Sequence, residues 1–214
     1  MKGARPLNKR EINHILPDFR GRNRLRDRAL FTTGITCGFR IQELLSLRVK
    51  DIILAGKVVN RVTVEKRNTK GRIESRNVQL LDTAREYLLA WITNGLWQRG
   101  YVSPETYLFK SEYGVNRPIS ARQAHRILTR NFERNRLPGK LGTHCMRKTY
   151  AKHMYEDFQA RRAAGESIDP LPNVSKALGH KSLNSTMNYL SFMTEDIDIS
   201  AANMERNLFG GITQ

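Results

Sequence analysis

The stretch that decides the fold is residues 36–47, Thr-Cys-Gly-Phe-Arg-Ile-Gln-Glu-Leu-Leu-Ser-Leu. Its apolar positions after the arginine recur at helical spacing and predict a helix with one buried face. Arg40 therefore stands at the edge of a core, where a cation needs an anionic partner. Glu43 lies one helical turn later and is placed to hold it, although an intrahelical Arg–Glu pair without any further role gives the same pattern.

The segments on either side of this stretch are mostly helical in pattern. Asn8 and Glu11 form a capping-box pattern for a first helix that ends before Pro17. Gly38 is the expected C-terminal stop of a helix over residues 23–37. Later helices are expected over residues 84–97 with Asp82 as the cap, from Ser120 to about residue 132, from a cap at Thr143, near 174–178 and near 183–192.

One region has the pattern of extended structure instead. Two β-branched stretches, at about residues 58–64 and 73–80, flank a basic turn at 66–71 and predict a β-hairpin. Residues 163–172 contain one glycine and two prolines and are expected to form a loop. The predicted fold class is therefore mainly α with a small antiparallel β-sheet (α+β).

The composition points to a partner that carries phosphate. The 214 residues include 37 Lys and Arg against 20 Asp and Glu, which leaves a formal net charge of +17, and 25 of the 37 cations are arginine. Such an excess indicates a polyanion, either nucleic acid or an anionic membrane surface. Arginine suits bidentate contacts to phosphate better than lysine does, and 39% hydrophobic residues are enough for a core.

Several classes of protein are excluded. Two cysteines, Cys37 and Cys145, are too few for a disulfide scaffold and fit a reducing compartment, so a cytoplasmic location is expected. No metal-ligand spacing and no glycine-rich nucleotide loop is present, so neither a metal nor another cofactor is expected. No apolar run is long enough for a signal peptide or a membrane span, so no membrane partner is expected.

Three short stretches later in the chain carry side chains that suit phosphodiester chemistry. His144 and Arg147 are three residues apart and share one face of a helix. His180 follows a helix-ending glycine, and Tyr189 lies on a helix that begins near residue 182. Cleavage of a phosphodiester needs fixed donors for the non-bridging oxygens, a nucleophile, and a proton for the leaving oxygen. Taken singly, each of these residues also fits a solvated face or a core position.

Taken together, these stretches resemble the catalytic boxes of the tyrosine recombinases, also called the phage integrase family. The matching residues are Gly38, Phe39, Arg40, Glu43, Leu44, His144, Arg147, Leu178, Gly179, His180, Thr186 and Tyr189. The family's hairpin lysine is matched best by Lys66, with Lys70 as the alternative. Lys148 stands where a histidine is usual, which is a departure from the pattern. The resemblance covers about residues 8–192, with a stretch over 154–174 that looks like an insertion.

The resemblance implies a site-specific DNA recombinase that acts without metal or ATP. It implies that Tyr189 attacks the scissile phosphate and forms a 3′-phosphotyrosyl link. Arg40 and Arg147 would clamp the non-bridging oxygens, and His180 would add a donor to the same oxygens. His144 would serve as the general base towards the tyrosine.

Lys66 completes the implied catalytic set as the general acid for the leaving oxygen. The implied partner is double-stranded DNA, bound by a homo-oligomer, taken as a tetramer, with accessory DNA-bending proteins and a role in a bacterial, archaeal or phage mobile element. We expect residues 1–214 to form a single catalytic domain, with a short N-terminal segment over 1–20 and without the family's N-terminal core-binding domain. This fits either a naturally short, one-domain recombinase or a catalytic domain cut from a longer chain. The tail over 193–214 is expected either to dock on a neighbouring protomer or to fold back on its own domain.

Two other functions fit part of the pattern. A type IB topoisomerase shares the tyrosine and the arginines but only relaxes DNA. A DNA-binding protein with a decayed catalytic pocket would keep the fold, although all six expected residues are present here. Outside the boxes, Arg122, Arg126 and Arg130 recur every four residues and would share a helical face towards DNA, while the five arginines over 20–28 are too regularly spaced to share one.

Overall fold

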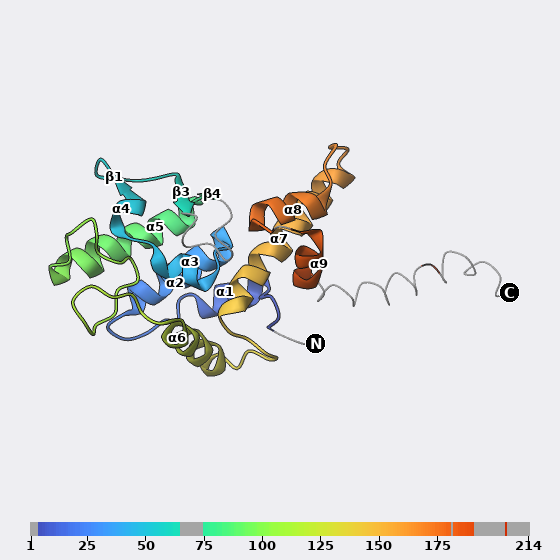
Figure 1. Cartoon of the computed structure of the whole chain (residues 1–214). Coiled ribbons are helices and arrows are strands. Elements are labelled where there is room, and N and C mark those ends of the chain that lie inside the picture. The colour runs from blue at the N-terminus through green and yellow to red at the C-terminus, as the bar shows by residue number, and fades with distance from the viewer. Residues whose placement is uncertain (1–3, 65–74, 181, 191–203, 205–214) are drawn as a thin grey trace.

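The computed structural model describes residues 4–64, 75–180, 182–190 and 204, with the backbone alone at 188 and 189. Within these ranges the chain is mainly helical, with two small antiparallel sheets of two strands each. The predicted fold class is confirmed. Figure 1 shows a larger body formed by the first two thirds of the chain and a smaller one formed by the last helices, joined by the long helix α7.

The first two helices form as the local signals predict. In α1 (Lys9–Ile15), the side chain of Asn8 accepts from the Glu11 amide, and the Glu11 carboxylate accepts from the Asn8 amide, both at 2.9 Å. Helix α2 (Arg24–Cys37) ends at Gly38, whose φ of 61° lies in the left-handed region that favours glycine. This turn redirects the chain straight into α3 (Ile41–Ser46), where Leu44 and Leu45 are buried.

The predicted hairpin is present, and a smaller one precedes it. A short helix α4 (Val49–Ile52) leads into β1 (Ile53–Leu54) and β2 (Lys57–Val58), a pair that the sequence pattern did not predict. Strands β3 (Arg61–Val64) and β4 (Arg76–Gln79) then pair antiparallel, with Val62 opposite Val78 and Val64 opposite Arg76. The tip of this hairpin, with Lys66 and Lys70, lies outside the described residues.

The N-cap of helix α5 (Asp82–Trp91) lies one residue before the predicted cap. Leu81 is the N-cap and Asp82 is the first helical residue, where its carboxylate accepts from Arg85 at 2.9 Å. The helix then widens into a π-turn (Ile92–Leu96) and a 3₁₀-turn (Trp97–Arg99), so the expected single helix over 84–97 is wrong in its last two turns. A loop leads to α6 (Ala121–Arg134), which Ser120 caps as predicted.

Three helices complete the described chain. Helix α7 (Thr143–Ala163) has Gly142 as its N-cap, so the predicted cap Thr143 is instead its first residue. The loop expected over 163–172 is shorter, because Pro170 is the first residue of α8 (Pro170–Leu178). Proline is tolerated at this position because the amide hydrogen that it lacks would have no partner within the helix. Helix α9 (Leu183–Leu190) follows the turn that begins at Gly179.

The buried residues form two clusters that α7 connects. The larger core extends from α1 to the start of α7 and includes Cys145 and Met146. The smaller core lies among α7, α8 and α9 and includes Ala151, Phe158 and Leu178. Among the described residues, no helix combines the length and the apolar character that crossing a membrane requires.

The turn at Gly38 gives a test of how tightly the two bodies meet. A Cβ added at Gly38 would lie 2.3 Å from the ring of Tyr150, whereas one at Gly56, also at positive φ, would meet nothing within 4 Å. We therefore expect Gly56→Ala to cost about 1–2 kcal/mol of unfolding free energy for its backbone conformation alone. Gly38→Ala should cost about 1–3 kcal/mol more, because the ring of Tyr150 must move. Urea unfolding of both variants measures the difference, and equal losses would contradict the steric contribution.

Candidate active site

The candidate site forms where three distant segments meet: the α2–α3 junction, the start of α7 and the α8–α9 junction. Arg147 joins them. Its side chain is buried, 2% exposed, and donates one hydrogen bond to the carbonyl of Gly38 and another, of 2.6 Å, to the carbonyl of Leu178. The segment of Gly38 and Arg40 and the segment of Leu178 and His180 are thus both held by the side chain of Arg147.

Arg40 lies at the N-terminus of α3 and is paired with Glu43, as predicted. Its Nη1 is 2.8 Å from Oε1 of Glu43, and its backbone amide donates to Oε2 at 2.8 Å. The Glu43 side chain is 1% exposed, whereas that of Arg40 is 27% exposed. A fully buried carboxylate therefore holds an arginine whose guanidinium still reaches the surface.

His180 follows Gly179, which ends α8 in a left-handed conformation. Its Nδ1 lies 2.9 Å from Oγ1 of Thr186, which is buried on α9. When the hydroxyl donates to Nδ1, the imidazole carries its proton on Nε2. Burial, followed by the positive charges of Arg147, Arg40 and Arg76, lowers the pKa of His180 to about 4, and the charge of Glu43 opposes this shift only in part.

His144 lies in the first turn of α7, three residues before Arg147, and is exposed. Partial desolvation by its neighbours lowers its pKa, and the charges of Arg147 and Lys148 act in the same direction. A histidine with a lowered pKa is unprotonated at neutral pH and can accept a proton. Lys148, the departure from the family pattern, is half-buried, and burial lowers its own pKa.

For two of the six predicted catalytic residues, the side chain lies outside the described part of the structure. Lys66 lies outside the described residues. Tyr189 lies in α9, one turn after Thr186, but its side chain is likewise outside the described part of the structure. Helix α9 contacts both α7 and α8, so the backbone of Tyr189 belongs to the same small body as His180.

One residue of the site was missed by the sequence reasoning. Arg76 on β4 donates from Nη2 to Oε2 of Glu43 at 3.1 Å and from Nη1 to the carbonyl of Ala177 at 2.7 Å. The signal was available, because Arg76 shares a strand face with Val78, which is buried, and a charged residue at an inward position needs a partner.

The model of the phage integrase family matches residues 5–195. The chain belongs to the phage integrase family. A probable integrase/recombinase, YoeC of Bacillus subtilis, is 27% identical over 187 residues, which are 87% of this chain and 86% of that protein. The tyrosine recombinase XerD of Staphylococcus saprophyticus is 27% identical over 184 residues, which are 84% of this chain but 56% of that protein.

Solved structures of the family have the same fold. The XerH site-specific recombinase, in a post-cleavage complex with a palindromic difH substrate, matches with a TM-score of 0.68 and 25% identity. That match covers 94% of this chain and 53% of the XerH chain. The catalytic domain of bacteriophage HP1 integrase matches with a TM-score of 0.55 and 16% identity over 89% of each chain. The chain therefore spans about half the length of the Xer recombinases that it matches, and most of the length of YoeC.

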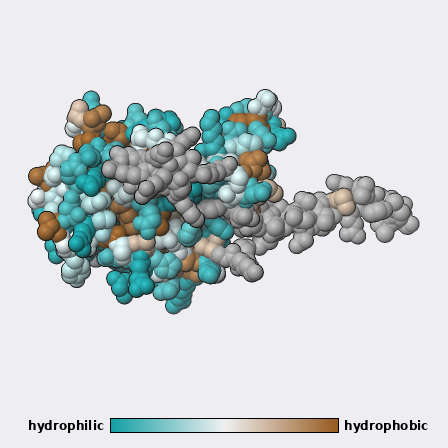
Figure 2. Space-filling view, in the orientation of Figure 1, coloured by the Kyte–Doolittle hydropathy of each residue, from teal (hydrophilic) through white to brown (hydrophobic). Residues whose placement is uncertain are grey.

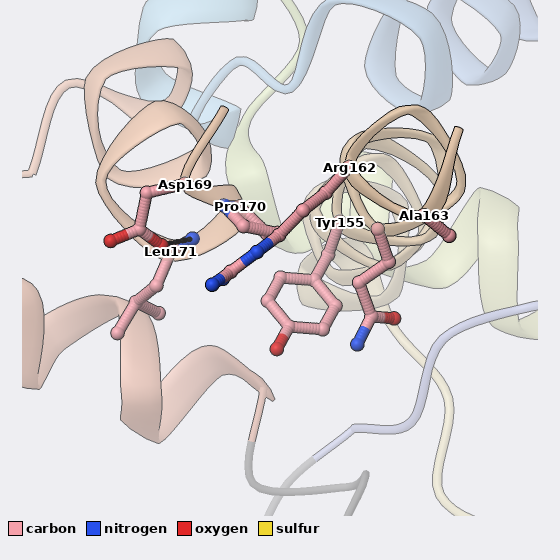
Figure 3. A pocket seen from close by; sticks show the side chains of 7 residues that line it. Tyr155, Arg162, Ala163, Asp169, Pro170 and Leu171 are labelled. Carbon is pink, nitrogen blue, oxygen red and sulfur yellow. Dashed lines mark hydrogen bonds between the residues drawn. The ribbon is translucent and has the colours of Figure 1, made fainter. Parts of the chain in front are cut away.

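Residues 154–174, where an insertion is expected, are mostly helical. Helix α7 continues to Ala163 and α8 begins at Pro170, so only a short turn separates them. Between these helix ends lies a pocket of about 480 Å³ (Figure 3), in which Tyr155 and Arg162 of α7 lie opposite Asp169 at the start of α8. The pocket is at the other end of both helices from Arg147, so it is separate from the candidate active site.

The lowered pKa of His180 predicts how stability depends on pH. Between about pH 4 and 6.5, the unfolded chain binds a proton at this histidine and the folded protein does not. The free energy of unfolding should therefore fall as the pH falls through this window. His180→Gln should show a smaller fall, and the remainder should include the contribution of His144, whose pKa is also lowered. Urea unfolding at pH 7 and pH 5 tests this, and an unchanged pH dependence in the variant would contradict it.

Proposed function

We propose that this chain is a site-specific DNA recombinase that cuts and rejoins double-stranded DNA through a 3′-phosphotyrosyl intermediate. The observation that carries the proposal is the convergence of Arg40, Arg147 and His180, from three distant segments, beside the helix that bears Tyr189. Membership of the phage integrase family supports it, and the relatives are named recombinases and integrases rather than topoisomerases.

The charge of the site suits a phosphodiester. The guanidinium groups of Arg40 and Arg76 pair with one buried carboxylate, that of Glu43, and these groups and Arg147 all act on His180. The cluster therefore has an excess of positive charge in a partly desolvated place, where electrostatic stabilisation of an anionic transition state is strongest. In our proposal Arg40 and Arg147 bind the non-bridging oxygens, and His180 donates a further hydrogen bond to them.

The proposed reaction exchanges one phosphoester for another. The phenolic oxygen of Tyr189 attacks phosphorus and loses its proton to His144, while the bond from phosphorus to the 5′ oxygen breaks. Lys66 delivers a proton to that oxygen, which leaves as a 5′ hydroxyl. A tyrosine hydroxyl has a pKa near 10 and is a weak nucleophile at neutral pH, so both the base and the arginine cluster are needed. Because the link to tyrosine keeps the phosphoester, rejoining requires no ATP.

The exposed arginines of α6 are proposed to position the duplex. Arg122, Arg126 and Arg130 are all exposed on one face, as their spacing predicts. α6 lies at the lower edge of the molecule in Figure 1, and that edge is hydrophilic in Figure 2. The arginines over residues 20–28 differ, since Arg20 pairs with Asp18 and the buried Arg26 pairs with Asp27. A homo-oligomer on DNA, and a tail over 193–214 that docks on a neighbour, belong to the same proposal.

The first test concerns the nucleophile. Tyr189→Phe should abolish covalent attachment to a nicked suicide duplex while DNA affinity stays nearly unchanged, because only the attacking oxygen is lost. A denaturing gel that separates protein from protein–DNA adduct measures the attachment. Tyr155→Phe is the matched control, since Tyr155 lines the separate pocket of Figure 3, and it should form the adduct normally. An adduct formed by Tyr189→Phe would contradict the assignment.

The second test concerns the basic face. If each arginine contacts one phosphate, replacing Arg122, Arg126 and Arg130 by Gln should reduce the slope of log affinity against log salt by about 0.9 per contact. Replacement of Lys57, Arg161 and Arg162 by Gln removes the same charge from exposed positions on β2 and α7 and serves as the control. Fluorescence anisotropy between 50 and 200 mM salt measures both slopes. Equal slopes for the two triple variants would remove α6 from the interface.

A further inference from the structure

Arg76 has contacts that its place on a short strand does not require. It lies on β4, opposite Val64, at the last described pair of the β3–β4 ladder. From there its guanidinium reaches both the buried carboxylate of Glu43 on α3 and the carbonyl of Ala177 in the last turn of α8. Its guanidinium carbon also lies 5.7 Å from the centre of the Phe39 ring. The side chain thus joins the segment of Arg40 to the segment of His180.

This connection runs beside the one made by Arg147. Arg147 joins the carbonyl of Gly38 to that of Leu178, and Arg76 joins Glu43 to the carbonyl of Ala177. The last carbonyls of a helix have no partner within it. Two arginines from different elements therefore take two successive carbonyls at the end of α8. The loop of His180 is fixed by both.

The glycine before His180 makes room for this arrangement. A Cβ on Gly179 would lie 2.9 Å from Cδ of Arg76 and 3.5 Å from its Nε. Any larger residue at position 179 must therefore displace the Arg76 side chain or the loop itself. The Leu-Gly-His stretch needs a glycine for the Arg76 side chain as well as for the left-handed turn.

The carboxylate of Glu43, shared by Arg40 and Arg76, also determines how much positive charge Arg40 keeps for binding a phosphate. Both oxygens of Glu43 are used, Oε1 by Nη1 of Arg40 and Oε2 by the backbone amide of Arg40 and Nη2 of Arg76. One negative charge is divided between two guanidinium groups, so it neutralises neither fully. If Arg76 were absent, Glu43 would pair with Arg40 alone and hold its guanidinium more strongly.

We propose that Arg76 is a positioning residue, which shares Glu43 with Arg40 and anchors the end of α8 so that Arg40 and His180 face the same phosphate. This inference rests on the proposed function, since the phosphate is that of the DNA strand to be cut. Arg76 acts through Arg40 and the His180 loop and does not itself contact the reacting atoms.

The test compares cleavage of two nicked duplexes, one with a normal scissile phosphate and one with a methylphosphonate, which lacks one charged oxygen. Arg76→Met should slow adduct formation on the normal duplex by about 10²-fold, the size expected for misplacement of a catalytic group. Affinity for the duplex should stay unchanged. On the methylphosphonate the loss should be smaller, because a misplaced Arg40 matters less when there is less charge to stabilise. Arg40→Met should show the same pattern, and Arg161→Met, at the far end of α7, should show no loss.

Equal losses on the two duplexes, no loss, or a loss of affinity that accounts for the slower rate would overturn the proposal. Arg76→Lys covers the case in which Arg76→Met does not fold. Lysine keeps the charge but cannot bridge two acceptors as a guanidinium does. The same dependence on the substrate, with a smaller loss, is then expected.

A measurement that needs no cleavage separates this proposal from the proposed function. NMR titration of the His180 ring should give a higher pKa in Arg76→Met than in the wild-type protein, because one of the charges that lower it is removed. A wild-type protein that forms no adduct would count against the recombinase activity alone. An unchanged titration of His180 would count against the role of Arg76 whether or not the DNA is cut.

Discussion

The buried guanidinium of Arg147 is the constraint on which the rest of the structure depends. A buried cation is costly unless its donors are satisfied, and the last carbonyls of a helix are acceptors that need a donor. The two terminal nitrogens of Arg147 donate to the carbonyl of Gly38, after the end of α2, and to that of Leu178, at the end of α8. Gly38 and Leu178 are far apart in the sequence, and the Arg147 side chain connects their carbonyls.

Helix α7, which carries Arg147, also connects the two hydrophobic cores of the chain. Its first turns belong to the larger core through Cys145 and Met146, and its later turns belong to the smaller core through Ala151 and Phe158. A Cβ on Gly34 of α2 would lie 2.4 Å from the sulfur of Met146, so the two helices are in close contact there. The candidate active site therefore lies where the two cores meet, and its geometry depends on how α7 packs against each of them.

Local signals predict several features of the fold, although the caps predicted at Asp82 and Thr143 lie one residue after the observed N-caps. The capping box of Asn8 and Glu11, the stop at Gly38 and the presence of a hairpin around the basic turn all follow from residues close to one another in the chain, whereas the register of the hairpin does not. The loop expected over 163–172 overlooks a local signal, because Asp169 caps α8 through the Leu171 amide and Pro170 takes the first helical position, where proline is favoured. The candidate residues were found as separate stretches, and the sequence could not show which groups hold them together. The partners of Arg147 and the role of Arg76 depend on contacts between distant segments, which no local pattern contains.

The space that Gly179 leaves for Arg76 has a consequence for exchanging parts between related enzymes. The β3–β4 hairpin and the α8–α9 turn are far apart in sequence, yet the arginine of one occupies the volume that a side chain on the other would need. A chimera that takes only one of these segments from a relative can combine a large side chain at position 179 with Arg76, and the two would clash. The two segments should therefore be exchanged together.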